Sequence, residues 1–212
     1  MWISIVVLGI LGFEFILILI AYLMASSTTR AFLAYNFSRC FGDSSYIMWL
    51  RWTWEIIQTH LGLGYGLVFI ICHRHARLTW AYGVTWIIQD KSSKYNGISL
   101  GSNIILNLPY DQPFMTPSKI CSDYLFMHEY GHSFDSHRWG PLYLIVIGLP
   151  SLVSIMYSQK PIAEGVTMHD FRWFEINANK HAAKFFSKYG VVWNGKHFPV
   201  LSLNEWLRYY SK

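Results

Sequence analysis

The sequence predicts an α+β fold that is mainly helical, contains a short antiparallel β-ribbon and is anchored in a membrane. Three observations lead to this fold class. The composition is 53% hydrophobic and only 14% charged, which is unusual for a soluble enzyme. The first 25 residues are almost wholly apolar, and the hydrophobic period changes from strand-like to helical after residue 108. The length of 212 residues suits one domain, residues 26–212, after an N-terminal membrane helix.

Residues 1–25 are predicted to form that transmembrane helix. The segment is apolar except for Ser4, Glu14 and Tyr22, and it is long enough to cross a bilayer. Because it lacks the basic start and the small-residue cleavage site of a signal peptide, we expect it to be retained as an anchor. Glu14 is a candidate functional group at this depth, although a carboxylate that faces other helices is the commoner case.

A second apolar stretch, Ile47 to Cys72, is expected to form a helix that is partly packed inside the protein. Its second half, from Leu61 onward, has no charged residue. Its first half carries Arg51, Glu55, Gln58 and His60.

Two strands are predicted before the middle of the chain. Tyr82 to Gln89 and Ile98 to Leu108 are rich in Val, Ile, Thr and Trp, and a polar turn over residues 90–97 joins them. We expect the two to pair in an antiparallel ribbon.

The next predicted helix carries the most informative feature of the chain, the HExxH sequence His128-Glu129-Tyr130-Gly131-His132. Two histidines four residues apart on a helix lie on one face, where both imidazoles can bind one Zn²⁺, and Glu129 can take a proton from water on that ion. Since HExxH fixes only three positions, a chance occurrence is the alternative.

The boundaries of this helix are readable. Thr116-Pro117-Ser118 supplies an N-cap with proline at the first helical position, and Gly140-Pro141 ends the run. Gly131 is unfavourable within a helix, by roughly 1 kcal/mol relative to alanine. We expect it to allow the close approach of another backbone or of substrate, or a helix-packing contact.

A third apolar stretch, Leu142 to Tyr157, is interrupted by Gly148-Leu149-Pro150-Ser151, a sequence expected to kink or turn a helix. We favour a kinked hairpin or a shallow helix that dips into the bilayer and returns, with the metal near the interface.

A third metal ligand follows by elimination. The metzincin pattern needs Gly and His where this chain has Asp135 and Arg138, and His137 is one position out of register. Downstream, Glu175 and Asn179 lie one helical turn apart, so Glu175 could bind the metal while the Asn179 amide holds a liganding histidine. The alternative is a solvated Glu175 paired with Lys180 or Arg172. His169 and Asp170 are weaker ligand candidates.

HExxH followed on a later helix by Glu-x-x-x-Asn resembles the gluzincin pattern, as in thermolysin and the membrane-bound CAAX prenyl proteases. The resemblance covers roughly residues 117–190. Residues 50–190 also resemble a group of small bacterial membrane proteins with an HEYGH motif, on stretches that include Gln58-Thr59-His60-Leu61-Gly62 and Gly140-Pro141-Leu142-Tyr143-Leu144. That group implies a fold and a membrane setting but no activity. Phe174 stands where the group has threonine.

Charges and aromatic residues suit a lipid surface. The net charge of +5 is spread over residues that flank apolar segments, which suits anionic headgroups, and no basic cluster indicates nucleic-acid binding. Ser202 and Glu205 form a capping box for a last helix whose Trp206, Tyr209 and Tyr210 could rest at the headgroups. Three widely spaced cysteines indicate buried free thiols rather than a disulfide framework.

Together these features predict a membrane-anchored zincin that hydrolyses peptide bonds, a metalloprotease with one Zn²⁺ per chain and a peptide or protein substrate. His128, His132 and Glu175 would bind the metal, and Glu129 would act as general base. Candidate donors to the oxyanion are Tyr157, His169 and Arg172. We expect substrate beside the predicted strands, because zincins commonly have an edge strand along the cleft; the alternative is a structural hairpin that covers the helix.

Two alternatives stay open. One is an inactive zincin-like protein that serves as a membrane binding protein, and the other is a structural membrane protein with a chance HExxH. The expected location is the bacterial cell membrane, with the side that the site faces and the oligomeric state undecided.

Overall fold

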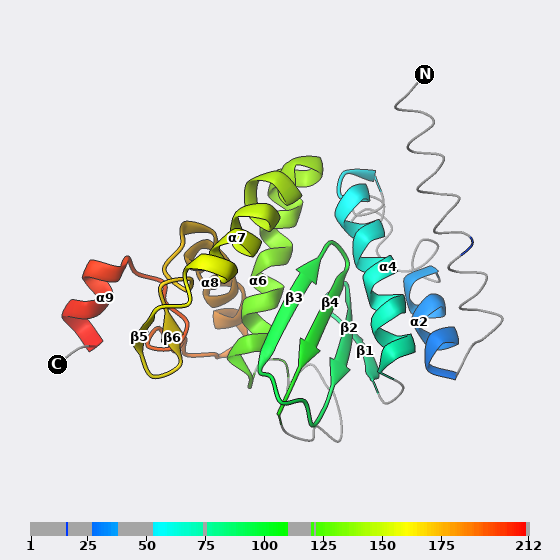
Figure 1. Ribbon diagram of the computed structural model, residues 1–212, viewed down its shortest axis with the longest axis horizontal. Helices are drawn as coiled ribbons and strands as arrows, with labels where there is room; N and C mark the ends of the chain where they lie inside the picture. Colours follow the sequence, from blue (N-terminus) through cyan, green and yellow to red (C-terminus); the bar gives the residue numbers. More distant parts are fainter. Residues whose placement is uncertain are drawn as a thin grey trace.

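The computed structural model describes residues 16, 27–37, 53–73, 76–109, 120 and 122–210. The membrane helix predicted over residues 1–25 lies outside the described residues apart from Ile16. Residues 116–118 also lie outside them, but the predicted start of the HExxH helix there is wrong, because this helix spans Tyr124–Trp139 with Asp123 as its N-cap. Within the described residues the fold is α+β and mainly helical, as predicted, with helices on both faces of a small sheet (Figure 1).

The sheet has four strands in the order β1-β2-β4-β3: β1 (Arg77–Ala81), β2 (Val84–Gln89), β3 (Asn96–Leu100) and β4 (Asn103–Asn107). The predicted antiparallel ribbon is therefore wrong in its pairing, because β2 and β4 run parallel at the centre of a mixed sheet. Two turns change the bounds of the predicted strands. Tyr82-Gly83, both with positive φ, joins β1 to β2, and Gly101, with φ 58°, separates β3 from β4. The hairpin β3–β4 folds back so that β3 becomes the edge strand.

Alternate residues of the central strands face opposite layers, as the strand period of two requires. Ile87 and Ile105 pack against α2 (Ser27–Phe37) and α4 (Ile56–Cys72). Trp86, Ile104 and Leu106 pack in the other cluster, with α6 (Tyr124–Trp139) and α8 (Trp173–Phe186). Both faces of β2 and β4 are buried, which fits continuous apolar strands at the centre of a sheet.

Helix α4 agrees with the prediction of a partly packed apolar helix. Leu63, Leu67 and Ile70 are buried, whereas Leu61 and Val68 are about half exposed. Cys72 at its end is exposed, so the prediction of a buried thiol is wrong there.

After α6 the chain forms η2 (Gly140–Leu142), the π-helical η3 (Leu144–Gly148) and α7 (Leu149–Tyr157). Helix α6 ends at Trp139, as Gly140-Pro141 predicts. The expected kink at Gly148–Ser151 is wrong, because the chain stays helical from Leu144 to Tyr157 and turns instead before it, by 116° relative to α6. A π-turn before Pro150 accommodates the missing N–H of proline without a break.

No single helix among the described residues is both long and apolar enough to cross a bilayer. One bent pair, Tyr124–Leu142 followed by Leu144–Tyr157, reaches that length and composition only when its two arms are taken together.

The C-terminal part contains the small hairpin β5 (Pro161–Ala163) and β6 (Val166–Thr167), then α8, η4 (Ser187–Tyr189) and α9 (Leu203–Tyr210). The Glu205 half of the predicted capping box of α9 is confirmed, since the Ser202 N–H donates to the Glu205 carboxylate; the Ser202 hydroxyl donates to the same oxygen. The expected headgroup position of Trp206 is wrong. Its ring is buried, and its indole N–H donates to the carbonyls of Gly195 and Lys196.

Candidate metal centre

Helix α6 positions the HExxH residues. Its N-cap is Asp123, whose carboxylate accepts the Leu125 N–H at 2.9 Å and the Tyr95 hydroxyl at 2.8 Å. Such a cap satisfies one of the free N–H groups at a helix start and is worth about 1 kcal/mol. The face that carries the two histidines packs against α8, the helix that carries Glu175.

Gly131 explains how closely the two helices approach. A Cβ atom at this position would lie 2.1 Å from the carbonyl oxygen of Ala178 in α8. The expectation of a close backbone approach is therefore confirmed, and the backbone in question is that of the ligand helix.

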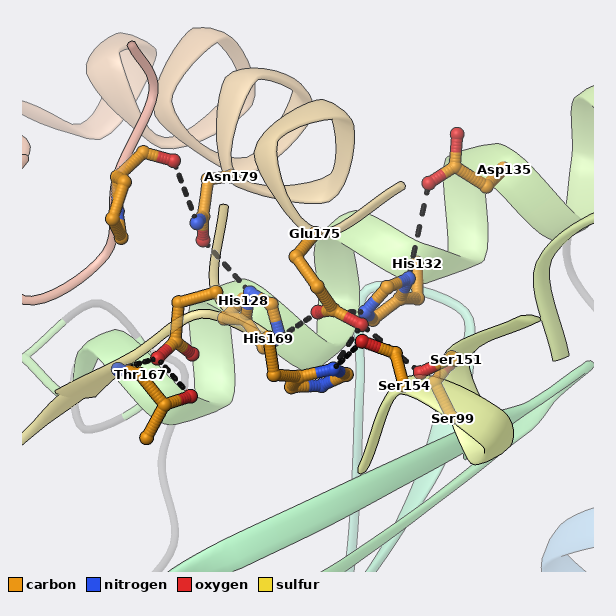
Figure 2. Close-up of polar contacts among 12 residues, drawn as sticks. Ser99, His128, His132, Asp135, Ser151, Ser154, Thr167, His169, Glu175 and Asn179 are labelled. Carbon is orange, nitrogen blue, oxygen red and sulfur yellow. Dashed lines mark hydrogen bonds and ion pairs between the residues drawn. The ribbon is translucent and has the colours of Figure 1, made fainter. Parts of the chain in front are cut away.

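The structure brings His128, His132 and Glu175 together, as the sequence pattern predicts (Figure 2). Glu175 Oε2 lies 3.2 Å from Nε2 of His128 and 3.2 Å from Nε2 of His132. The three ligand atoms all lie within 4.8 Å of one another. Two ligands of a tetrahedral zinc ion at about 2.1 Å are separated by roughly 3.4 Å, so this group can hold a metal ion of that size.

Asn179 lies where the pattern places it. Its Oδ1 is 2.7 Å from His128 Nδ1, and its amide donates to the Pro199 carbonyl at 2.9 Å, which determines the orientation of the amide. His128 therefore donates its Nδ1–H to Asn179, and its Nε2 faces the candidate metal position, where loss of its proton would free a lone pair for a metal.

Asp135 holds the corresponding place beside His132, a role that the sequence analysis did not assign. Its Oδ2 lies 3.8 Å from His132 Nδ1. Both atoms are buried, and among the described residues neither has a hydrogen-bond partner. Asp135 also contacts Asn177 and His181. The signal in the sequence was the i, i+3 spacing, which puts Asp135 one turn beyond His132 on the same side of α6.

The second carboxylate oxygen of Glu175 also has polar partners. Oε1 accepts the Ser151 hydroxyl at 3.0 Å and lies 3.3 Å from His169 Nε2. Ser151 belongs to α7, so the bent segment after α6 reaches the site directly. The alternative of a solvated Glu175 is wrong, because its side chain is buried among these partners.

Glu129 lies on the wall of the site next to the edge strand. Its side chain is buried, and a Cβ atom added to Gly97 in β3 would lie 2.6 Å from its Cγ and its Oε1. Glycine at this position therefore makes the room that Glu129 occupies.

The charged groups of the site shift one another's pKa values. Burial disfavours the charged imidazolium of His128, but the hydrogen bond and the charge of Glu175 outweigh it and raise the pKa of His128 to about 9. The pKa of His132 is raised in the same way, against its burial. Burial would raise the pKa of Glu175, yet the two imidazoles hold it well below its ordinary value. Glu175 is thus a carboxylate, which suits a metal ligand.

At Glu129, unlike at Glu175, the effect of burial on the pKa is larger than the effect of the imidazoles. Burial raises the pKa of this carboxyl, and the positive imidazoles only partly counter the shift. A raised pKa is the direction that suits a general base working near neutral pH.

A cavity of about 420 Å³ opens onto these groups. Its lining joins the edge strand, the candidate ligands, Glu129 and an apolar wall that includes Leu144, Ile147, Leu149, Leu152 and Ile155. Small-molecule and peptide sites commonly combine such an apolar wall with a few converging polar groups.

The three expected oxyanion donors lie in different surroundings. His169 lines the cavity, and its Nδ1 is 3.0 Å from the Ser154 hydroxyl. Tyr157 is 80% exposed, and Arg172 donates to Ser158 at 2.6 Å; neither lines the cavity. Tyr143, which the sequence analysis did not single out, does line it, and its hydroxyl donates to the Ser99 carbonyl at 3.3 Å. Burial first, then the nearby carboxylates, raise the pKa of Tyr143 well above 10, so it stays a donor.

Comparison with known proteins finds no matching family model, no matching curated protein and no matching solved structure. A proposal for the function of this protein therefore rests on the chemistry of the site itself.

Proposed function

We propose that this protein is a membrane-associated, zinc-dependent peptidase of gluzincin type. The observation that carries the proposal is the convergence of four groups on one cavity, namely the imidazoles of His128 and His132, the Glu175 carboxylate and the Glu129 carboxylate. Two histidines and one carboxylate, with one coordination position left open, are the ligand set of zinc peptidases. Held there, a zinc ion would polarise the scissile carbonyl and make water a better nucleophile.

The residues of the site have separable roles in this mechanism. Glu129 accepts the proton of the attacking water and passes it to the leaving amine. Tyr143 and His169 line the same cavity and are the candidates to donate a hydrogen bond to the developing oxyanion. Asn179 orients the imidazole of His128 by a hydrogen bond, and the Asp135 carboxylate lies beside Nδ1 of His132.

Substrate binding is proposed along β3. The Ser99 carbonyl faces the cavity side, since it accepts the Tyr143 hydroxyl. Alternate residues of a strand present their N–H and C=O groups to the same side, so Gly97 faces the same way as Ser99. An extended peptide could therefore add to this edge as a further strand, with its scissile bond near Glu129.

Replacing Glu129 with glutamine tests the proposal. An amide cannot take the proton, so Glu129→Gln should keep one zinc per chain and lose about 10²–10⁴-fold in peptide hydrolysis. Zinc is measured by elemental analysis of the purified protein, and hydrolysis by mass spectrometry of a mixed peptide library. Glu164→Gln, in the exposed turn of the β5–β6 hairpin, is the matched control and should change neither quantity.

Two results would contradict the assignment. Loss of zinc from Glu129→Gln would make Glu129 a ligand and not a base. Stoichiometric zinc in the parent protein without cleavage of any peptide would favour the inactive binding protein instead.

A further inference from the structure

The outward side of residues 142–157 is an apolar surface, which we call the outer face. Six of its side chains are 45–66% exposed: Leu142, Ile145, Leu149, Leu152, Val153 and Met156. Most of them recur at three- or four-residue spacing, so they form one stripe along η3 and α7. Exposed apolar stripes of this length on proteins mark a partner or a membrane.

No charged residue interrupts this segment. The run from Trp139 to Gln159 contains no Asp, Glu, Lys or Arg, and it is bounded by Arg138 on one side and Lys160 on the other. Both cations are exposed. Their long side chains can reach phosphate groups while the residues between them lie in an apolar medium.

A carboxylate that contacts the end of α6 is turned inward. Glu55 is fully buried, and it contacts the Ser136 hydroxyl and the His137 ring. Beside it the ring of Trp54, which is 46% exposed, donates to the His137 carbonyl at 3.0 Å. At the C-terminal end of α6, an aromatic ring and aliphatic side chains are therefore exposed to solvent, whereas the carboxylate of Glu55 is buried.

The direction of the segment favours a lipid surface. Because the chain bends by 116° after α6, η3 and α7 do not continue the axis of α6 but fold back beside it (Figure 1). A helix that lies in the plane of a bilayer surface buries an apolar side about 5–10 Å deep and keeps cations at the headgroups. In a two-fold contact between copies, Arg138 and Lys160 would find no carboxylate within residues 139–159 to pair with.

We propose that the outer face lies in the boundary between headgroups and acyl chains of an anionic bilayer, with Arg138 and Lys160 at the lipid phosphates. The proposed position of the outer face does not depend on whether the protein is a peptidase. Leu149 and Leu152 belong both to the outer face and to the cavity wall, so the cavity opens at the bilayer surface. If the proposed peptidase function holds, its substrates are peptide segments held at that surface.

Depth-dependent quenching tests the proposal on the full chain. In a protein whose three cysteines are replaced by serine, an environment-sensitive fluorophore is attached to Ile145→Cys, to Met156→Cys or to a control, Val192→Cys. The protein is reconstituted in vesicles of phosphatidylcholine and phosphatidylglycerol, with or without doxyl-labelled lipid. Val192 is an apolar side chain that is 85% exposed, but its carbonyl accepts the Tyr124 hydroxyl at the opposite end of α6. The 16 residues of α6 put the two ends about 24 Å apart.

Labels at Ile145 and Met156 should shift to the blue and lose most of their fluorescence to the doxyl lipid, while the label at Val192 keeps its aqueous spectrum. Aqueous spectra at both test positions would overturn the proposal. Blue-shifted labels that lipid does not quench, together with cross-linking of Ile145→Cys between chains, would assign the outer face to a second copy. Equal quenching at all three positions would also overturn it, because the orientation would then be wrong.

Discussion

Replacement of Gly131 by alanine tests the packing on which the candidate metal centre depends. The glycine lies between the two histidines of HExxH, and its Cα faces the backbone of α8. A Cβ there would lie 2.1 Å from the Ala178 carbonyl oxygen. An ordinary contact begins at 3.4 Å, so α6 and α8 must separate by about the difference, 1.3 Å. A side-chain rotation cannot relieve this contact, because the Ala178 oxygen belongs to the backbone.

The stability effect combines two opposing contributions. Overpacking of a close contact costs about 1–3 kcal/mol. Alanine in place of glycine favours the helix by roughly 1 kcal/mol. The metal-free variant should therefore be destabilised by about 0–2 kcal/mol, a modest loss that leaves it folded.

The effect on zinc should be much larger. Metal–ligand distances tolerate only about 0.2 Å, whereas the separation moves Glu175 away from both imidazoles by several times that amount. Loss of a ligand should weaken zinc binding by more than the roughly 10–100-fold that outer-shell changes cost. Zinc affinity is measured by competition with a chromogenic chelator, and stability by thermal melting of the metal-free protein.

Gly64→Ala is the matched control. It is also a helical glycine, in α4, but a Cβ there has no atom within 4 Å. It should stabilise the protein by up to about 1 kcal/mol and leave zinc affinity unchanged. If Gly131→Ala leaves zinc affinity unchanged, as Gly64→Ala should, the close contact between α6 and α8 does not hold the metal ligands in place.

Three further predictions concern the site. Asp135→Ala should weaken zinc binding by about 10–100-fold in chelator competition, since His132 loses the carboxylate beside its Nδ1; unchanged affinity would leave Asp135 a packing role. Gly97→Ala should displace the Glu129 carboxylate and lower hydrolysis by about 100-fold with zinc retained, whereas full activity would contradict the contact at β3. The pKa of His128, raised from 6.5 to about 9, stabilises the metal-free fold fully below pH 6.5 and less as pH rises through 9. Melting temperature should fall over that window while zinc affinity rises by about tenfold per pH unit, and a flat profile of both would refute the shift.

Local spacing by itself determined several features. The two histidines of HExxH share a helix face, Glu175 and Asn179 lie one turn apart, and Gly140-Pro141 ends α6, because each depends only on the helical period or on backbone conformations of neighbouring residues. The capping box of α9 follows for the same reason.

Only the tertiary structure decided which of these local pieces meet. Strands β2 and β4 pair in parallel because the β3–β4 hairpin folds back, a choice among long-range contacts that strand propensity does not encode. Trp206 is buried since Gly195 and Lys196 offer carbonyls to its indole. Tyr143 and Gly97 reach the site through the 116° bend and through the edge of the sheet. Their roles come from contacts between segments far apart in the chain, whereas sequence periodicity reports only on neighbours within a few turns.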